Sequence, residues 1–119
     1  MAGSFALSGC GGAPAASERV VRWRVEGATA RLRYVAPPTA LRPSPVSVAA
    51  PGARLTGASI EAIMTDMSMP PVRLVLRPAG DGTYQGRLLL TMGGPWLYVV
   101  TLRFGDRVAV RRVRVWAEG

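Results

Sequence analysis

The chain is 119 residues long, carries a formal net charge of +8 and contains no histidine; all of its basic side chains are arginines. Without histidine, a Ser-His-Asp triad, a Cys-His dyad and a histidine-ligated metal site are excluded, and the single cysteine, Cys10, excludes an internal disulfide. The length favours one domain, and no apolar run is long enough to span a bilayer. The carboxylates lie apart in the sequence, so we expect no enzyme.

Residues 1–17 read as a signal and tether that precede the folded domain. Leu7-Ser8-Gly9-Cys10 resembles the bacterial lipobox, in which the cysteine becomes the lipidated first residue of the mature protein. Gly11-Gly12 is typical of the start of a flexible tether. Nine residues precede Cys10 and none is basic, unlike a normal signal, so we hypothesise that the true start codon lies upstream. The alternative is a disordered tail with a chance cysteine.

From Arg19 onward, apolar and polar residues alternate in short runs, which predicts half-buried strands. Prolines at 37–38, 43 and 45 predict a rigid extended connection between the second and third runs. The last run has imperfect parity, so a bulge is expected at Arg111-Arg112. No stretch has a helical period with caps. We therefore predict that residues 18–119 form an all-β, antiparallel, immunoglobulin-like β-sandwich of seven to eight strands. The expected strands cover residues 19–26, 30–34, 46–48, 58–66, 72–77, 83–92, 96–102 and 108–116.

Four of the five methionines lie between residues 60 and 96. The alternation of the strand at 58–66 places Met64 on its inner face. Met67 and Met69 have the opposite parity, and Pro70-Pro71 follows them, so they are expected on the loop at the strand end. Met92 directly precedes the turn at 93–95.

A thioether is a soft, neutral donor that suits Cu(I). Met67 and Met69 are the best candidate ligands, with Met92 as a third if the two loops lie at the same end of the sandwich. Met64 and Asp66 are secondary candidates. The alternative is that the methionines fill gaps beside Trp96, since sulfur–aromatic contacts contribute about 0.3–1.5 kcal/mol.

Several short motifs, in order, resemble the YtkA-like/FixH family of small extracytoplasmic domains. The matching pieces are Gly57-Ala58, Met67-Ser68-Met69-Pro70, Gly82-Thr83-Tyr84-Gln85-Gly86 and Met92-Gly93-Gly94-Pro95-Trp96. The resemblance implies an immunoglobulin-like fold, a location outside the cytoplasm, and an association with copper handling or respiratory oxidase assembly. FixH is anchored by a membrane helix, and the lipid on Cys10 would replace it here.

Most arginines fall on outward strand faces, where a solvated surface or attraction to anionic lipid explains them. Nucleic acid is not an expected partner, because Trp23 and Tyr34 alternate onto the face opposite their neighbouring arginines. The leading hypothesis is a non-enzymatic, lipid-anchored envelope domain that binds Cu(I) and works beside an envelope or respiratory-complex protein. The alternative is a metal-free structural or interaction module at the membrane surface.

Overall fold

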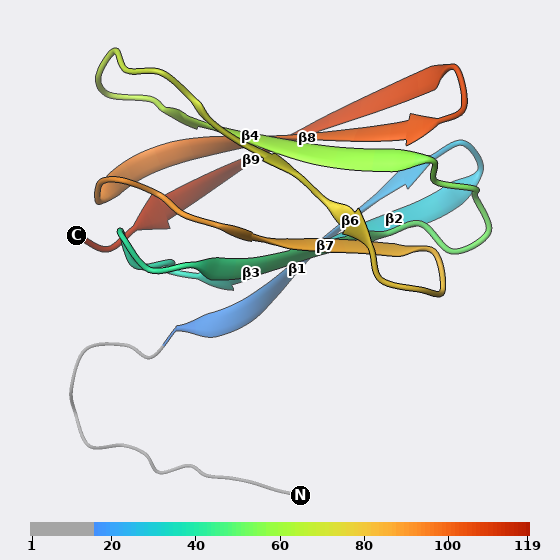
Figure 1. The fold of residues 1–119 in the computed structure, drawn as a ribbon, viewed down its shortest axis with the longest axis horizontal. Helices are drawn as coiled ribbons and strands as arrows, with labels where there is room; N and C mark the ends of the chain where they lie inside the picture. The colour runs from blue at the N-terminus through green and yellow to red at the C-terminus, as the bar shows by residue number, and fades with distance from the viewer. Residues whose placement is uncertain (1–15) are drawn as a thin grey trace, which may run out of the picture.

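A computed structural model describes residues 16–119, which form strands joined by turns and loops, with no helix in that range. The alternating patterns of the sequence become nine strands, coloured in chain order in Figure 1. Their bounds are β1 (Ser17–Val25), β2 (Ala28–Ala36), β3 (Ser44–Ala49), β4 (Gly57–Met64), β5 (Val72–Val75), β6 (Arg77–Pro78), β7 (Thr83–Leu88), β8 (Gly94–Phe104) and β9 (Arg107–Ala117).

The strands form two antiparallel sheets that pack face to face (Figure 1). The first sheet has five strands in the order β1-β2-β3-β7-β6, and the second has four in the order β5-β4-β8-β9. Apart from the added edge strands β1 and β5, this is the strand order of a constant-type immunoglobulin domain. The predicted immunoglobulin-like sandwich is confirmed, with nine strands instead of seven to eight.

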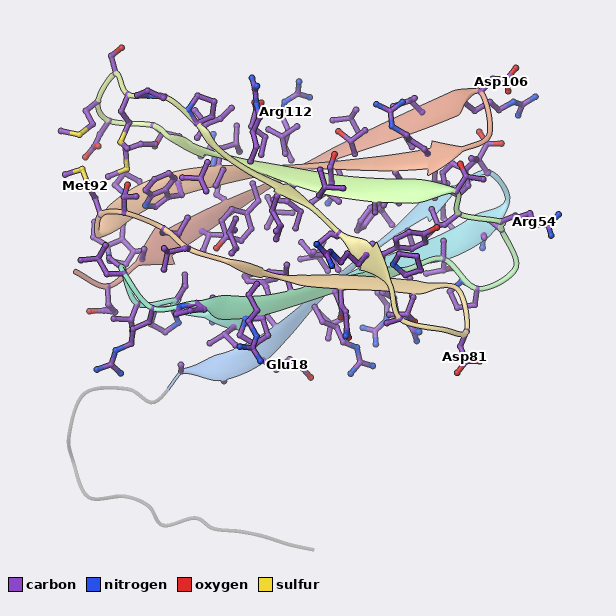
Figure 2. The ribbon with its side chains drawn as sticks, in the orientation of Figure 1. Glu18, Arg54, Asp81, Met92, Asp106 and Arg112 are labelled. Carbon is purple, nitrogen blue, oxygen red and sulfur yellow. The ribbon has the colours of Figure 1, made fainter. Side chains whose placement is uncertain are left out.

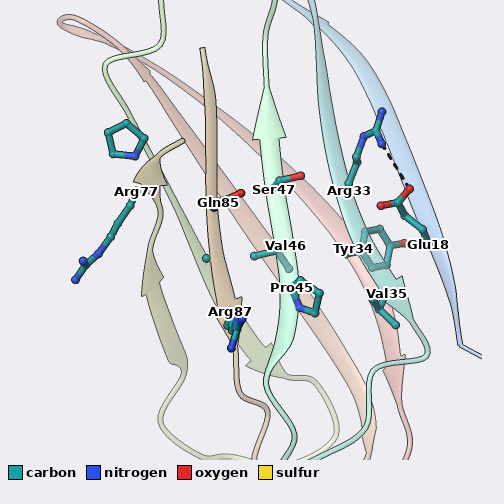
Figure 3. Close-up of a pocket in the computed structure, with 12 residues that line it drawn as sticks. Glu18, Arg33, Tyr34, Val35, Pro45, Val46, Ser47, Arg77, Gln85 and Arg87 are labelled. Atoms are coloured by element: carbon teal, nitrogen blue, oxygen red, sulfur yellow. Dashed lines mark ion pairs between the residues drawn. The ribbon is translucent and has the colours of Figure 1, made fainter. Parts of the chain in front are cut away.

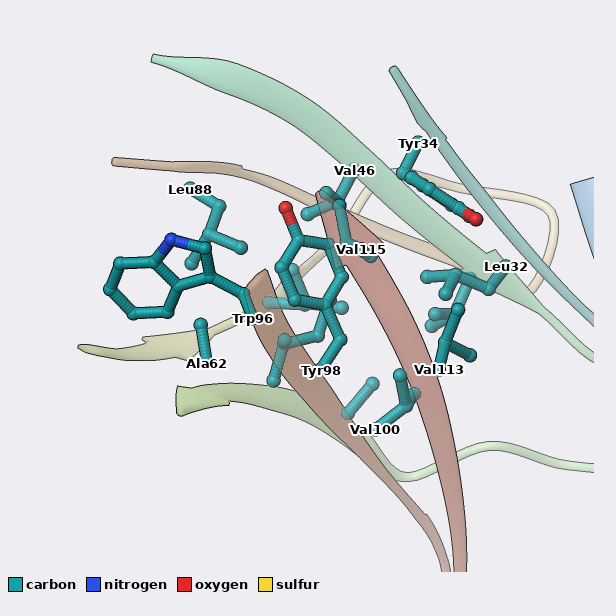
Figure 4. Close-up of a cluster of buried hydrophobic side chains, with 14 of the residues drawn as sticks. Leu32, Tyr34, Val46, Ala62, Leu88, Trp96, Tyr98, Val100, Val113 and Val115 are labelled. Atoms are coloured by element: carbon teal, nitrogen blue, oxygen red, sulfur yellow. The ribbon is translucent and has the colours of Figure 1, made fainter. Parts of the chain in front are cut away.

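The core lies between the sheets and is built from alternate residues of each strand (Figure 4). Trp96, Tyr98, Val100 and Leu102 of β8 are each no more than 1% exposed, which confirms the inner face predicted from the sequence. Tyr98 meets Tyr34 of the other sheet edge-on, with 5.9 Å between ring centroids. Burial raises the pKa of the Tyr98 hydroxyl above its usual range, and the nearby Tyr34 adds to the shift.

The chain changes sheets between β5 and β6 through a single residue, Leu76. Its side chain is buried and its N–H donates to the Ala58 carbonyl of β4 at 2.9 Å, while Arg77 already pairs with Gln85 of β7. A Cβ atom at Gly86 would lie 3.0 Å from the Leu76 side chain, so the glycine leaves room for this crossing. The crossing divides the single strand expected at 72–77 into two.

The prediction of a bulge at Arg111-Arg112 is wrong. The register of β8 with β9 is continuous, from Phe104 opposite Arg107 to Gly94 opposite Ala117. Val108 and Val110 are about half exposed on the outer face, whereas Val113 and Val115 are buried. The change of parity in the sequence therefore marks a sheet with apolar residues on both faces, not an inserted residue.

Candidate functional site

Three loops meet at one end of the sandwich, on the left in Figure 1. Residues 65–71 follow β4 and residues 89–93 precede β8, and Met64 at the end of β4 lies opposite Trp96 near the start of β8. The Thr65 N–H donates to the Pro95 carbonyl at 3.1 Å, and the Leu41 N–H donates to the Leu90 carbonyl at 2.7 Å. We call the surface formed by residues 37–43, 65–71 and 89–93 the loop end.

The loop end carries three of the four methionines of residues 16–119, and the fourth, Met64, ends β4 just beneath it. Met67 is 47% exposed and Met92 is 39% exposed, so both thioethers reach solvent. Met69 is partly buried and packs against the core. Met64 is only 5% exposed and lies in the core itself, as its parity predicted. In Figure 2 the sulfur atoms, drawn in yellow, gather at the end of the molecule where Met92 is labelled.

Trp96 connects the loop end to the core. Its ring is 1% exposed, and its indole N–H donates to the Met92 carbonyl at 3.0 Å. The bond fixes the backbone of residues 89–93 above a buried aromatic ring. The position of Met92 thus depends on the packing of Trp96.

Gly94 lets the buried methionine approach the turn closely. Its φ of +121° lies in a region that side chains rarely adopt, and a Cβ atom there would lie 2.9 Å from the Met64 methyl group. Met64 therefore packs beneath the turn that leads from Met92 into β8, which makes it a support for the loop end and a poor candidate for a solvent-accessible ligand.

The side chains at the loop end offer a ligand set dominated by thioethers. Asp66 is exposed beside Met67 and supplies a carboxylate. Among residues 16–119 no group of three or more His, Cys, Asp or Glu side chains is placed to hold a metal ion. The loop end thus offers three thioethers, one carboxylate and neutral hydroxyls, and among these the thioethers suit Cu(I). The metal assignment itself stays a prediction.

Sequence reasoning missed two apolar residues at the same end. Leu41 is 70% exposed and Leu89 is 43% exposed, so the exposed methionines have exposed leucines on the neighbouring loops. The signal for Leu89 was present in the sequence, because three consecutive leucines at 88–90 cannot all point inward from one strand. Leu41 has a φ of +65°, and nothing in the local sequence predicted it.

The lipidation candidate Cys10 lies outside the described residues, so its role stays a prediction. Among the residues that the structure describes, no helix is long and apolar enough to cross a membrane.

Comparison of the chain with protein-family models, with curated proteins and with solved structures finds no match. The resemblance to the YtkA-like/FixH family therefore stays a prediction.

Proposed function

We propose that this protein is a non-enzymatic β-sandwich domain that binds Cu(I) at its loop end through the thioethers of Met67, Met69 and Met92. The observation that carries the proposal is that the fold brings two methionine-bearing loops, 65–71 and 89–93, to the same end of the sandwich. Met67 and Met92 are accessible there without unfolding.

The chemistry of the loop end supports a monovalent soft ion. Thioethers carry no charge, so they bind Cu(I) without a deprotonation step, and they compete poorly for harder ions. The exposed leucines at positions 41 and 89 add apolar surface to the same end of the sandwich, and apolar surroundings favour a weakly hydrated ion. The partly buried Met69 would supply a ligand held in place by the core.

An anaerobic titration of Cu(I) against a chromogenic chelator tests the proposal. We expect one Cu(I) per chain, and we expect Met67→Leu, Met69→Leu and Met92→Leu each to weaken binding, because leucine keeps the volume but removes the sulfur. Met64→Leu is the matched control, since this buried residue should not bind the ion. If the chelator keeps all the copper, or if the three variants bind like the control, the proposal is wrong.

A metal-free interaction module is the second candidate, and it is favoured by the apolar character of the loop end. Leu41, Met67, Leu89 and Met92 are all large hydrophobic residues with more than a third of their surface exposed, which is typical of a protein contact surface. In this case the Met→Leu variants would keep partner binding, whereas Leu41→Ser with Leu89→Ser would abolish co-purification with the partner from envelope membranes.

We also propose that the domain is held at the outer side of a membrane by a lipid on Cys10, where copper handling or the assembly of a respiratory oxidase would supply the partner. The support is the sequence Leu7-Ser8-Gly9-Cys10. Mass spectrometry of the membrane-fraction protein should find acyl chains on this cysteine, and Cys10→Ser should release the domain. An unmodified Cys10 in the membrane fraction would refute the anchor and leave the copper site untouched.

A further inference from the structure

The outer face of the five-stranded sheet is an array of arginines. Outward-facing residues of four of its strands include six arginines, and their only carboxylate is Glu18. Glu18 pairs with Arg33 at 3.5 Å, and both side chains remain about half exposed (Figure 3). We call this surface the arginine face; its arginines are Arg22 and Arg24 on β1, Arg31 and Arg33 on β2, Arg77 on β6 and Arg87 on β7.

Within the arginine face, some charges are placed unfavourably in the unbound protein. Arg22 lies directly opposite Arg31 on the neighbouring strand, and like charges in this position destabilise a sheet. The Nε atom of Arg31 is buried and has no hydrogen-bond partner among the described residues. A bound anion would screen the repulsion between Arg22 and Arg31 and accept hydrogen bonds from the guanidinium groups of the arginine face that reach solvent.

The surface between the arginines is hollow. One depression of about 600 Å³ is lined by residues that include Arg33, Arg77 and Arg87. A second, of about 290 Å³, is lined by Arg31, Arg33, Ser47, Ala49 and Thr83. The two depressions share Arg33 and Ser47, so they are neighbours on the arginine face. Figure 3 shows the residues that line the larger one.

We propose that the arginine face binds the phosphate groups of anionic phospholipid headgroups, so that the five-stranded sheet lies against a membrane surface. The arginines are spread over several strands as a two-dimensional array, which suits a layer of headgroups better than a single linear chain. Exposed aromatic rings on which nucleotide bases could stack are missing from the outward residues of these strands. This inference is independent of the copper site, which lies at the loop end.

The opposite face provides a control surface. Arg112 and Arg114 of β9 lie outward on the four-stranded sheet, opposite Val99 and Leu97. The same face carries Trp116, which is 62% exposed. The other two tryptophans are partly buried (Trp23) or fully buried (Trp96), so a change in fluorescence that is lost in Trp116→Phe reports contact on this face.

The experiment is sedimentation of the full chain, carrying Cys10→Ser to prevent lipidation, with vesicles. We expect binding to vesicles that contain phosphatidylglycerol but not to phosphatidylcholine alone, and loss of binding in high salt. Each arginine near an anionic surface contributes roughly fivefold in affinity. Arg31→Gln with Arg87→Gln should therefore weaken binding about 25-fold, and Arg22→Gln with Arg24→Gln should have a similar effect.

The control variant, Arg112→Gln with Arg114→Gln, removes the same charge from the other face and should change binding far less. An equal loss in the control, a blue shift on vesicle binding that disappears in Trp116→Phe, or no binding to anionic vesicles would overturn the proposal. Binding to a soluble acidic peptide but not to the vesicles would also overturn it. Far-ultraviolet circular dichroism of each variant checks that the fold is retained.

Discussion

Replacing Trp96 by phenylalanine should destabilise the domain and loosen the loop end together. The indole is 1% exposed and donates to the Met92 carbonyl at 3.0 Å. Loss of that hydrogen bond should lower the free energy of unfolding by about 0.5–1.5 kcal/mol. The cavity left by the smaller ring should lower it by roughly a further 1–3 kcal/mol. We therefore expect the free energy of unfolding to fall by about 1.5–4.5 kcal/mol, out of the 5–15 kcal/mol typical of a domain.

Urea denaturation followed by circular dichroism measures this change. The midpoint should shift to lower urea while the slope stays constant, because the same surface is exposed on unfolding. Trp116→Phe is the matched control: the side chain is 62% exposed, so its replacement should change stability by less than about 0.5 kcal/mol. If both variants have the same midpoint, the structural role assigned to the indole is wrong. If Trp96→Phe also leaves Cu(I) affinity unchanged, the backbone of residues 89–93 does not position a ligand.

Three further outcomes are expected. Gly94→Ala should lower stability by about 1–3 kcal/mol in the same urea assay, because φ is +121° and the Met64 methyl group fills the space; an unchanged midpoint would contradict this. Because the pKa of Tyr98 is higher in the folded than in the unfolded chain, stability should fall as pH rises above the ordinary tyrosine value of about 10. Tyr98→Phe should flatten that decline, and an identical pH profile would refute it. Arg22→Gln should raise stability by about 0.2–1 kcal/mol at low salt by removing the Arg22–Arg31 repulsion; a gain that persists at high salt would point to another cause.

The local alternation of apolar and polar residues predicted the strands and their inner faces well, because successive side chains of a strand point to opposite faces of the sheet. Met64, Trp96 and Tyr98 all lie where their parity placed them. The same reasoning failed at β9, where the change of parity between Val110 and Val113 was interpreted as a bulge although the register is continuous. An apolar residue on an exposed face has the same local signature as a buried one.

Features that depend on pairing between distant strands were not visible in the sequence. Loops 65–71 and 89–93 lie at the same end because β4 pairs with β8. The sequence alone does not determine that pairing, so Met92 could be predicted as a third ligand only on the condition that the loops meet. The opposition of Arg22 and Arg31 depends on the register of a hairpin. The exposed position of Leu41 depends on a hydrogen bond to Leu90, 49 residues away. Each is a property of register and topology, which a short periodic pattern does not determine.

The one-residue crossing at Leu76 has a mechanical consequence for the whole molecule. The Leu76 N–H is hydrogen-bonded to the four-stranded sheet, and the next residue, Arg77, pairs with the five-stranded sheet. The backbone therefore connects the two sheets directly at this point. Sliding one sheet past the other would break the Leu76–Ala58 hydrogen bond and expose the buried Leu76 side chain. The two layers should therefore come apart in one event, which keeps the copper candidates and the arginine face in a fixed relation for as long as the protein is folded.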